Sequence, residues 1–427
     1  MNWRNLKKLI TFTLTFVFFY IFCSIPANYL LASPKPWETD KNELSLQGLY
    51  LGSKQQLIQI KYQERIITYS YEPDALFALM GLYSGTLLDL AEFPCEIPVQ
   101  IILTKSGTIR AMRNIIEHHP PTQGEFLSNF GHYATLNPNE EYYTIYDYLK
   151  GLSLYNLKDP QAPVSLSSLP LCAWNNEGTK LAYADNYFLG IYAPQEKNNK
   201  RYFFPNNNLG TVRIVTSLAF NPQDDRLFYS FLEDYPQQGS NVFQLNVLDM
   251  KGNTLATKVV ENLGPACWLS QNIIVFVLNP SESELGKIVL WNYRFNKTRL
   301  LLNFQGYCQN LCVNYQTNTL AYAIAQETNW QEELSLYDLT TNKATMIKSF
   351  ISPLHHLQWT KDNLLIFWDE INNTITILNE KGELIKKTSG FLPEKSVAKN
   401  FLFFPEKPIS EALPLYLSNY KPATKVN

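Results

Sequence analysis

Cysteine, histidine and charged residues are scarce in this chain. Its 427 residues include 6 Cys and 5 His, and 17% are charged, against about a quarter in an average soluble domain. No HExxH occurs, which excludes the helical zinc-protease motif, and the C-x-x-x-C of Cys308 and Cys312 has no second pair to complete a zinc site. The formal net charge of -2 offers no excess of cations for phosphate groups. The sequence therefore predicts no metal or other cofactor and no nucleic-acid partner.

The rest of the composition is that of a folded protein. Hydrophobic residues make up 45% of the chain and aromatic residues 14%, so disorder is not expected over most of its length. The chain is longer than the roughly 100–200 residues of one ordinary core. We therefore expect either several domains or one domain built from repeats.

Residues 1–34 form a separate segment. Three basic residues lie among the first eight, and an uncharged stretch with the core LITFTLTFVFFYIF follows. This is the layout of an export signal or of an N-terminal hydrophobic helix that anchors the chain. Cleavage after Ala32 would place Leu30 where a small residue is preferred, which favours the anchor, and the bulky Phe22 disfavours lipid attachment at Cys23. In each case we expect the segment to contact the membrane and the folded part to be extracytoplasmic.

One phrase recurs along the chain with small variations: an apolar anchor, a polar turn and a second apolar run. The anchors are Leu136, Trp174, Phe220, Trp268, Val313 and Trp359, separated by 38, 46, 48, 45 and 46 residues. Two further strand-like runs follow each copy, such as LSLYDLTTNK and KATMIKSF. Four short strands repeated about every 45 residues are typical of a β-propeller blade. The sequence predicts an all-β propeller over residues 126–390 with six visible four-stranded blades.

The best-preserved copy, CAWNNEGTKLAY, carries a family resemblance. Its Trp174, Gly178 and Leu181-Ala182-Tyr183 match the Trp-x-x-x-Gly-x-x-Leu-Ala-Tyr repeat, which resembles that of TolB-like propellers related to WD repeats. The resemblance implies that the anchors pack between neighbouring sheets. The ring could close as six blades or recruit terminal strands into a seventh. The C-terminal residues 391–427 could close the ring or lie across it.

Two sets of residues lie at fixed positions relative to the anchors. Cys172, Cys267 and Cys312 come one or two residues before an anchor, where a small buried side chain is expected to pack. His132, Thr216, Gln309 and His355 each come four residues before an anchor. In a six-bladed ring the first and last blades would be neighbours, so both imidazoles would reach one channel mouth. We therefore interpret these four residues as a polar collar that could hold a ligand, with local hydrogen bonding as the alternative.

The turns of a propeller alternate between the two faces of its disc. Long segments between the second and third strands carry Glu233, Asp234, Glu282, Glu284, Glu327, Trp330 and Glu332, which predicts an acidic face. Turns between the third and fourth strands carry Lys158, Lys197, Lys200, Lys251, Arg294, Lys297, Lys343 and Lys381, which predicts a basic face. The functional interpretation is a basic side attracted to an anionic membrane and long loops turned toward a partner. Ordinary solvated turns are the alternative.

Residues 45–125 do not follow the repeat. Strands are expected at QQLIQIKYQ, RIITYSYE and VQIILTKS, and helices at PDALFALMGLYSGTLLDLAEF and GTIRAMRNIIEHH, which together make a small α/β domain. The first helix followed by FPCEIPVQIILTKS resembles the leading half of peptidase-MA-like zinc metallopeptidases. The zinc-binding helix is missing, because Glu117, His118 and His119 are adjacent instead of four apart. No catalytic residue is therefore assigned.

These features favour a non-catalytic propeller, tethered to the membrane or exported, that binds a protein, peptide or cell-envelope component through its long-loop face. The alternative is an envelope hydrolase, or the inactive descendant of a metallopeptidase, that uses the N-terminal α/β domain. A paired acid, base or metal constellation would distinguish the enzyme, and the sequence contains none.

Overall fold

The structure is a computed structural model that describes residues 39, 43–54, 57–80, 85–115, 119, 122–204, 212–235, 240–281, 284–326, 331–393, 401–405, 407 and 413–418. The chain forms two compact units that part near residue 117. No helix in the described part of the chain has the length and hydropathy that a membrane crossing requires. The predicted segment 1–34 lies outside the described residues.

The smaller unit is a β-barrel. Its strands are β1 (Leu44–Lys54), β2 (Leu57–Tyr62), β3 (Arg65–Met80), β4 (Gly85–Leu87), β5 (Ile97–Leu103) and β6 (Ile109–Asn114). Pairing runs β1-β2-β3-β6-β5 and returns from β5 to β1, so five strands close on themselves, with β3 and β6 parallel. This connectivity is that of the OB-fold, a small Greek-key barrel. Inward side chains such as Ile58, Val99 and Ile101 are fully buried and form its core.

The prediction of an α/β domain is wrong. The first expected helix is the second half of β3 together with β4 and a short 3₁₀ turn at Leu90–Glu92, and the second is β6. Both faces of these strands are covered: Phe77 and Leu79 are buried on one side, and Ala78 packs with Ile102 and Ala111 on the other. Apolar residues therefore follow one another along these strands, without the alternation of apolar and polar residues that marks a strand exposed on one face. A continuous apolar run of this kind also resembles a helix.

The larger unit contains six four-stranded antiparallel sheets, and each begins with its innermost strand. Blade 1 is β8 (Tyr133–Leu136), β9 (Tyr142–Asp147), β10 (Gly151–Asn156) and β11 (Asp159–Ser167); blade 2 is β12 (Cys172–Trp174), β13 (Leu181–Ala184), β14 (Phe188–Ala193) and β15 (Asn198–Phe203); blade 3 is β16 (Val212–Phe220), β17 (Arg226–Tyr235), β18 (Ser240–Asp249) and β19 (Thr254–Val260). Blade 4 is β20 (Leu263–Ser270), β21 (Ile273–Leu278), β22 (Gly286–Asn292) and β23 (Lys297–Phe304); blade 5 is β24 (Tyr307–Asn314), β25 (Thr319–Ala325), β26 (Glu332–Asp338) and β27 (Lys343–Phe350); blade 6 is β28 (Leu354–Trp359), β29 (Leu365–Asp369), β30 (Thr374–Leu378) and β31 (Leu384–Ser389).

A seventh sheet closes the ring. It joins β7 (Gly124–Gly131) from the start of the unit to β32 (Leu402–Phe403) and β33 (Leu413–Ser418) from its end, in the order β32-β33-β7. Its buried residues share one cluster with blade 1 and blade 6, and Phe404 and Leu415 in that cluster are fully buried. The predicted architecture is therefore confirmed with seven blades, and part of the C-terminal segment closes the ring.

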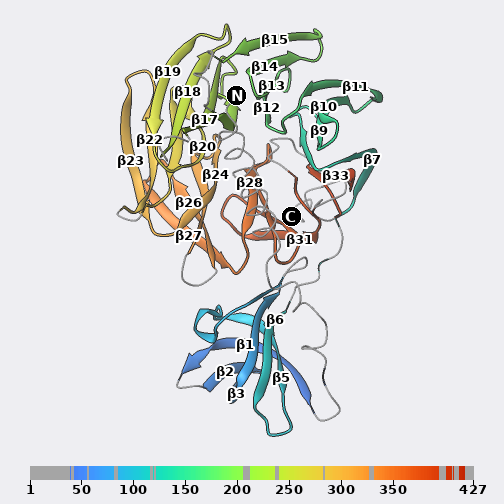
Figure 1. Ribbon diagram of the computed structural model, residues 1–427, viewed down its shortest axis with the longest axis vertical. Helices are drawn as coiled ribbons and strands as arrows, with labels where there is room; N and C mark the ends of the chain where they lie inside the picture. Colours follow the sequence, from blue (N-terminus) through green and yellow to red (C-terminus); the bar gives the residue numbers. More distant parts are fainter. Residues whose placement is uncertain are drawn as a thin grey trace, which may run out of the picture. The chain divides into compact units, whose positions relative to one another are not determined.

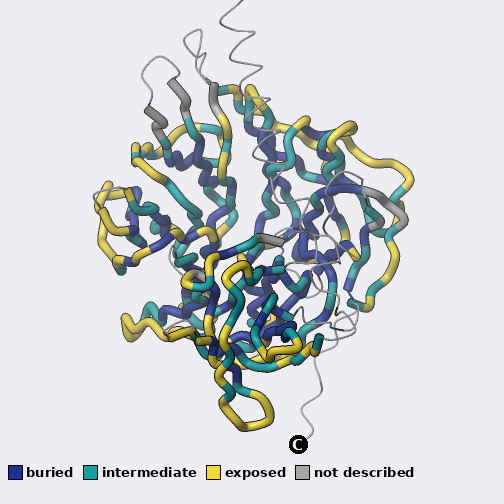
Figure 2. Tube along the Cα trace, turned by 60° about the horizontal axis from the view of Figure 1, so that its bottom comes forward, coloured by how far each residue is buried: buried dark blue, intermediate teal, exposed yellow. Residues whose placement is uncertain are grey.

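The blades surround a common centre, with β12, β20, β24 and β28 on the inside and β11, β15, β19 and β23 at the periphery (Figure 1). Buried residues follow the middle of the sheets, and exposed ones gather at turns and outer strands (Figure 2). As predicted, the anchors Trp268 and Trp359 are buried, with 1% and 5% of their surface exposed. Trp174 is only half-buried.

Candidate functional site

A central pocket lies between the inner strands of the propeller. It has a volume of about 380 Å³, and its walls come from the first strands of blades 1 to 6. Residues near both ends of these strands line it: Thr216 and His356 stand before their anchors, and Asn176 and Tyr315 follow theirs in the turn to the second strand. The pocket therefore extends along the inner strands.

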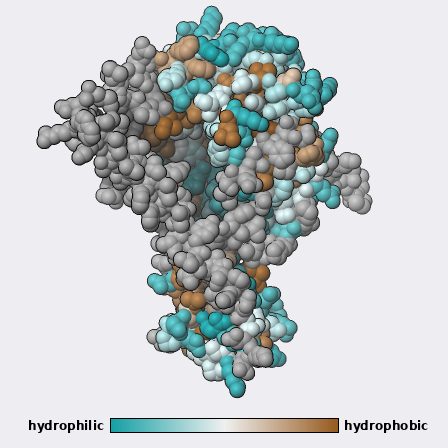
Figure 3. Space-filling view, turned by 45° about the vertical axis from the view of Figure 1, so that its right-hand side comes forward, coloured by the Kyte–Doolittle hydropathy of each residue, from teal (hydrophilic) through white to brown (hydrophobic). Residues whose placement is uncertain are grey.

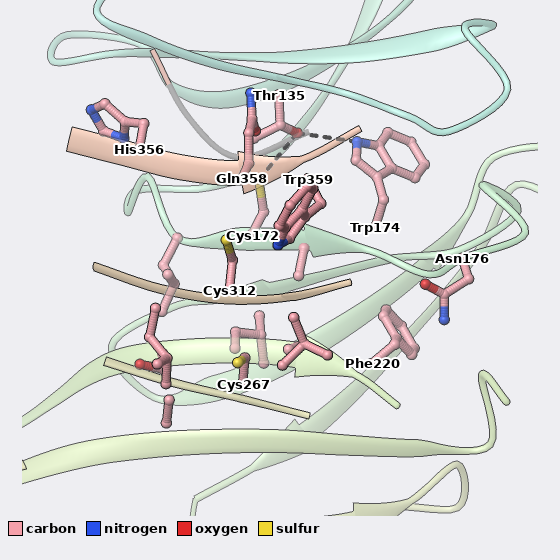
Figure 4. Close-up of a pocket in the computed structure, with 18 of the residues that line it drawn as sticks. Thr135, Cys172, Trp174, Asn176, Phe220, Cys267, Cys312, His356, Gln358 and Trp359 are labelled. Carbon is pink, nitrogen blue, oxygen red and sulfur yellow. Dashed lines mark hydrogen bonds between the residues drawn. The ribbon is translucent and has the colours of Figure 1, made fainter. Parts of the chain in front are cut away.

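Aromatic and aliphatic side chains make up much of the wall (Figure 4). Five of the six anchors line it: Leu136, Trp174, Phe220, Val313 and Trp359. The indole N–H of Trp174 donates to Thr135 Oγ1 over 3.1 Å. The indole nitrogen of Trp359 is buried and has no hydrogen-bond partner among the described residues. The wall thus contains one strong donor that the described protein leaves unsatisfied.

Three thiols also line this pocket. Cys172, Cys267 and Cys312 lie in the inner strands β12, β20 and β24, as predicted, and none of them is in a disulfide. Cys172 Sγ of blade 2 lies 3.6 Å from Thr144 Oγ1 of blade 1. Among the described residues, no three His, Cys, Asp or Glu side chains are grouped closely enough to hold a metal ion.

The structure does not gather the four predicted collar residues into one group. Thr216 lines the pocket and shares a 2.8 Å hydrogen bond with Ser230, whereas Gln309 is not among the residues that line it. His132 packs on the ring of Tyr148 with centroids 4.0 Å apart, and His355 contacts Glu370. The premise of adjacent first and last blades is wrong, because the seventh sheet stands between blades 6 and 1.

β-bulges explain this dispersal. The pairing of the first and second strands slips at Thr216 in blade 3, at Gln309 in blade 5 and between His355 and Gln358 in blade 6. A bulge re-aims side chains. In blade 6 it places His356, which has a φ of 55°, on the pocket wall together with Gln358. Sequence reasoning missed these two residues, since the motif LHHLQW gives no sign of which His faces inward.

A charged network links blades 6 and 7 beside His355. His355 Nε2 lies 2.9 Å from Glu370 Oε2, and Lys407 Nζ donates to Glu370 Oε1 over 2.7 Å. The hydrogen bond with His355 and the ammonium of Lys407 lower the pKa of Glu370 to about 2, although burial acts in the opposite direction. Lys407 also lies 5.3 Å from the ring centre of Trp368.

Glu332, from the predicted acidic loops, is buried in the part of the chain that the structure describes. It begins β26 with 4% of its surface exposed, and its Oε2 accepts the backbone N–H of Leu354. Burial raises its pKa to about 7, and the hydrogen bond from Leu354 and the nearby His355 oppose this rise. The prediction that Glu332 is an exposed loop residue is therefore wrong.

The other predicted acidic residues are placed as follows. Glu284 is exposed and pairs with Lys287 over 2.6 Å. Glu233 and Asp234 lie in β17, which is longer than β13, the corresponding second strand of blade 2. They are therefore strand residues and not loop residues. Glu282, Glu327 and Trp330 lie outside the described residues.

The turns between second and third strands also present apolar side chains. We call this side of the disc the loop face, and the side with the turns between first and second strands the turn face. On the loop face, Tyr148, Leu149, Tyr187 and Leu285 are 55%, 95%, 74% and 50% exposed. Figure 3 shows one side of the molecule, on which hydrophobic side chains lie among hydrophilic ones over the described surface.

Two of these turns are fixed by their own aspartates. Asp147 Oδ1 accepts the backbone N–H groups of Leu149 and Lys150 over 2.8 and 3.0 Å. In blade 2, Asp185 Oδ1 accepts the N–H of Asn186, and its own N–H donates to the Phe188 carbonyl. The contact from Asp147 to Leu149 is an Asx turn, and local hydrogen bonds likewise order the main chain beside Tyr187.

No protein-family model and no curated protein sequence matches this chain. Solved structures of similar fold include an oligogalacturonate lyase in complex with manganese (TM-score 0.51, 12% identity, 81% of this chain and 96% of that chain). The β-propeller domain of the Trilobed protease from Pyrococcus furiosus gives a TM-score of 0.51 at 11% identity, over 70% of this chain and 97% of that chain. That domain is described as having an open velcro topology, whereas here β7 pairs with β33.

The acylaminoacyl peptidase of Pyrococcus horikoshii is also similar (TM-score 0.51, 11% identity, 70% of this chain), and the chain spans about half of its length, 52%. At these identities the likeness concerns the fold alone. Together with the seven sheets, it shows that the larger unit is a β-propeller.

Proposed function

We propose that this chain is a non-catalytic β-propeller that binds a protein or peptide partner of the cell envelope at its loop face. Its first 34 residues would export it or tether it to the cytoplasmic membrane, so that the propeller works on the extracytoplasmic side. The basic residues before an uncharged apolar stretch support this location. The repeat's resemblance to TolB-like propellers is part of the same proposal.

The observation that carries the proposal is the display of exposed apolar side chains on hydrogen-bonded turns of the loop face. Leu149 is 95% exposed and Tyr187 74% exposed, and both stand in neighbouring blades on turns fixed by Asp147 and Asp185. A turn whose backbone is already ordered loses little conformational entropy on binding. Tyrosine in particular is enriched where proteins meet.

The charged groups near the channel support binding over catalysis. Glu370 is engaged by His355 and Lys407, and the buried Glu332 accepts a backbone N–H. These contacts use the carboxylates to join blades 5, 6 and 7. A catalytic acid or base would instead face a bound substrate.

Site-specific photocrosslinking in the source cells tests the proposal. A benzophenone amino acid at position 149 or 187 should give the same discrete adduct with one partner protein. Phe295 provides the matched control, because it is 72% exposed but lies in the turn between β22 and β23, on the turn face. An identical adduct from position 295, or none from positions 149 and 187, would contradict binding at the loop face.

A further inference from the structure

We propose that the central pocket is a second binding site, which takes a small uncharged molecule with an aromatic or aliphatic body. This inference goes beyond partner binding at the loop face, because the pocket lies between the inner strands and none of the exposed tips Tyr148, Leu149, Tyr187 and Leu285 lines it.

The first argument is space. The pocket volume is about 380 Å³. An apolar cavity of about 150 Å³ already accepts benzene, and pockets for small ligands start at roughly 300 Å³. The centre of this propeller therefore has room for a molecule of two or three rings.

The second argument is charge. The described residues that line the pocket include no Lys, Arg, Asp or Glu. A charged ligand would lose hydration on entering, and the imidazole of His356 is the only possible cation among the described lining residues. Phosphates, carboxylates and metal ions are therefore poor occupants, whereas an uncharged molecule is not penalised.

The third argument is the chemistry of the walls. Trp174, Phe220 and Trp359 offer aromatic surface, and the three thiols add polarisable sulfur beside it. The buried indole N–H of Trp359 has no partner among the described residues, and a ligand oxygen could satisfy it if the ring turned toward the pocket. The best occupant thus combines an apolar body with one hydrogen-bond acceptor.

Alkylation of Cys267 in the full chain tests this inference. Cys267 lines the pocket and is partly exposed, whereas Cys95 is an exposed thiol of the β-barrel unit and serves as internal control. The probe is prodan, an uncharged naphthalene ketone, and its anionic counterpart is anilinonaphthalene sulfonate. At about ten times its dissociation constant, prodan should slow iodoacetamide alkylation of Cys267 roughly tenfold, as measured by mass spectrometry. The rate at Cys95 should not change, and the sulfonate should protect neither thiol.

Two variants that fill the pocket complete the test. Ala173→Leu and Val313→Phe place larger side chains on the wall, and prodan should no longer protect Cys267 in either. If one variant fails to fold, the other still decides. The inference is overturned by a Cys267 that does not react without ligand, by equal protection from the sulfonate, or by protection that survives the filling variants. None of these outcomes depends on the loop face, so failure here leaves the proposed partner binding intact.

Discussion

Glu332 shows how far a single residue can depart from its sequence context. It stands in AQETNWQEE, a polar segment typical of an exposed loop, yet its carboxyl is buried where β26 meets β28. Burial raises the pKa to about 7 from an ordinary value of 4.5. At a pH between 4.5 and about 7, the carboxyl of Glu332 has lost its proton in the unfolded chain but keeps it in the folded chain. The free energy of unfolding therefore falls as pH rises through this range and stays lower above it.

The Glu332→Gln variant tests this directly. A shift of this size corresponds to about 3 kcal/mol, so the variant should gain up to that amount relative to wild type between pH 4.5 and pH 8. Urea unfolding at the two pH values measures the difference. Glu333→Gln, at the next position of β26, controls for the loss of one carboxylate. If the gap between Glu332→Gln and wild type did not change with pH, the carboxyl would not be buried as described.

Individual anchors were predictable because the repeat fixes their position. Trp268 and Trp359 are buried between sheets as expected, since large aromatic side chains dominate core burial. Gln309 and His355 were not predictable in orientation. Their direction depends on β-bulges, which insert a residue without any change in residue type that a sequence would reveal.

At the scale of elements, the polar turns after several anchors join neighbouring blades. Asp224, in the turn of blade 3, accepts four hydrogen bonds from blade 2: from Asn175 Nδ2 and from the N–H and Nδ2 of Asn176 at 2.9 Å, and from the N–H of Glu177 at 3.0 Å. A similar contact joins Asn314 to Asn363 between blades 5 and 6. The repeated phrase therefore encodes both a hairpin and a lateral link.

Removing the carboxylate of Asp224 should loosen this link. We expect Asp224→Ala to lower the free energy of unfolding by about 2 kcal/mol, because bonds to a charged acceptor are lost. Asp224→Asn should cost about half as much, since Asn keeps one acceptor and tolerates the φ of 58° at this position. Chemical denaturation followed by fluorescence measures both. Glu177→Ala, at an exposed neighbouring position, is the control, and equal values for all three variants would refute the lateral link.

The elements of the smaller unit were predicted less well, for a physical reason. Leu, Ala and Met in β3 favour helix by propensity, but this strand lies between the barrel core and a second cluster that includes Ala78 and Ala111. Tertiary burial on both faces overrides local preference. By contrast, β2 and β5 were predicted correctly.

At the scale of the whole molecule, the repeat predicts the ring but not its closure. The six visible blades are local in sequence, whereas the seventh pairs Leu413–Ser418 with Gly124–Gly131 from the other end of the unit. Neither strand contains the repeated phrase. Pairing between segments so far apart depends on the ring bringing the chain ends together, which no local pattern expresses.

The closing sheet should contribute to the stability of the entire propeller. Leu415 is fully buried in β33, in the cluster that also contains Ile145 of blade 1 and Trp368 of blade 6. Leu415→Ala should therefore lower the free energy of unfolding by about 2–5 kcal/mol, through lost burial and the cavity left behind. Leu300→Ala on the outer strand β23, where the side chain is 50% exposed, should change it by no more than about 0.5 kcal/mol. Urea unfolding monitored by tryptophan fluorescence compares the two variants. A Leu415→Ala protein as stable as Leu300→Ala would mean that the terminal strands do not hold the ring closed.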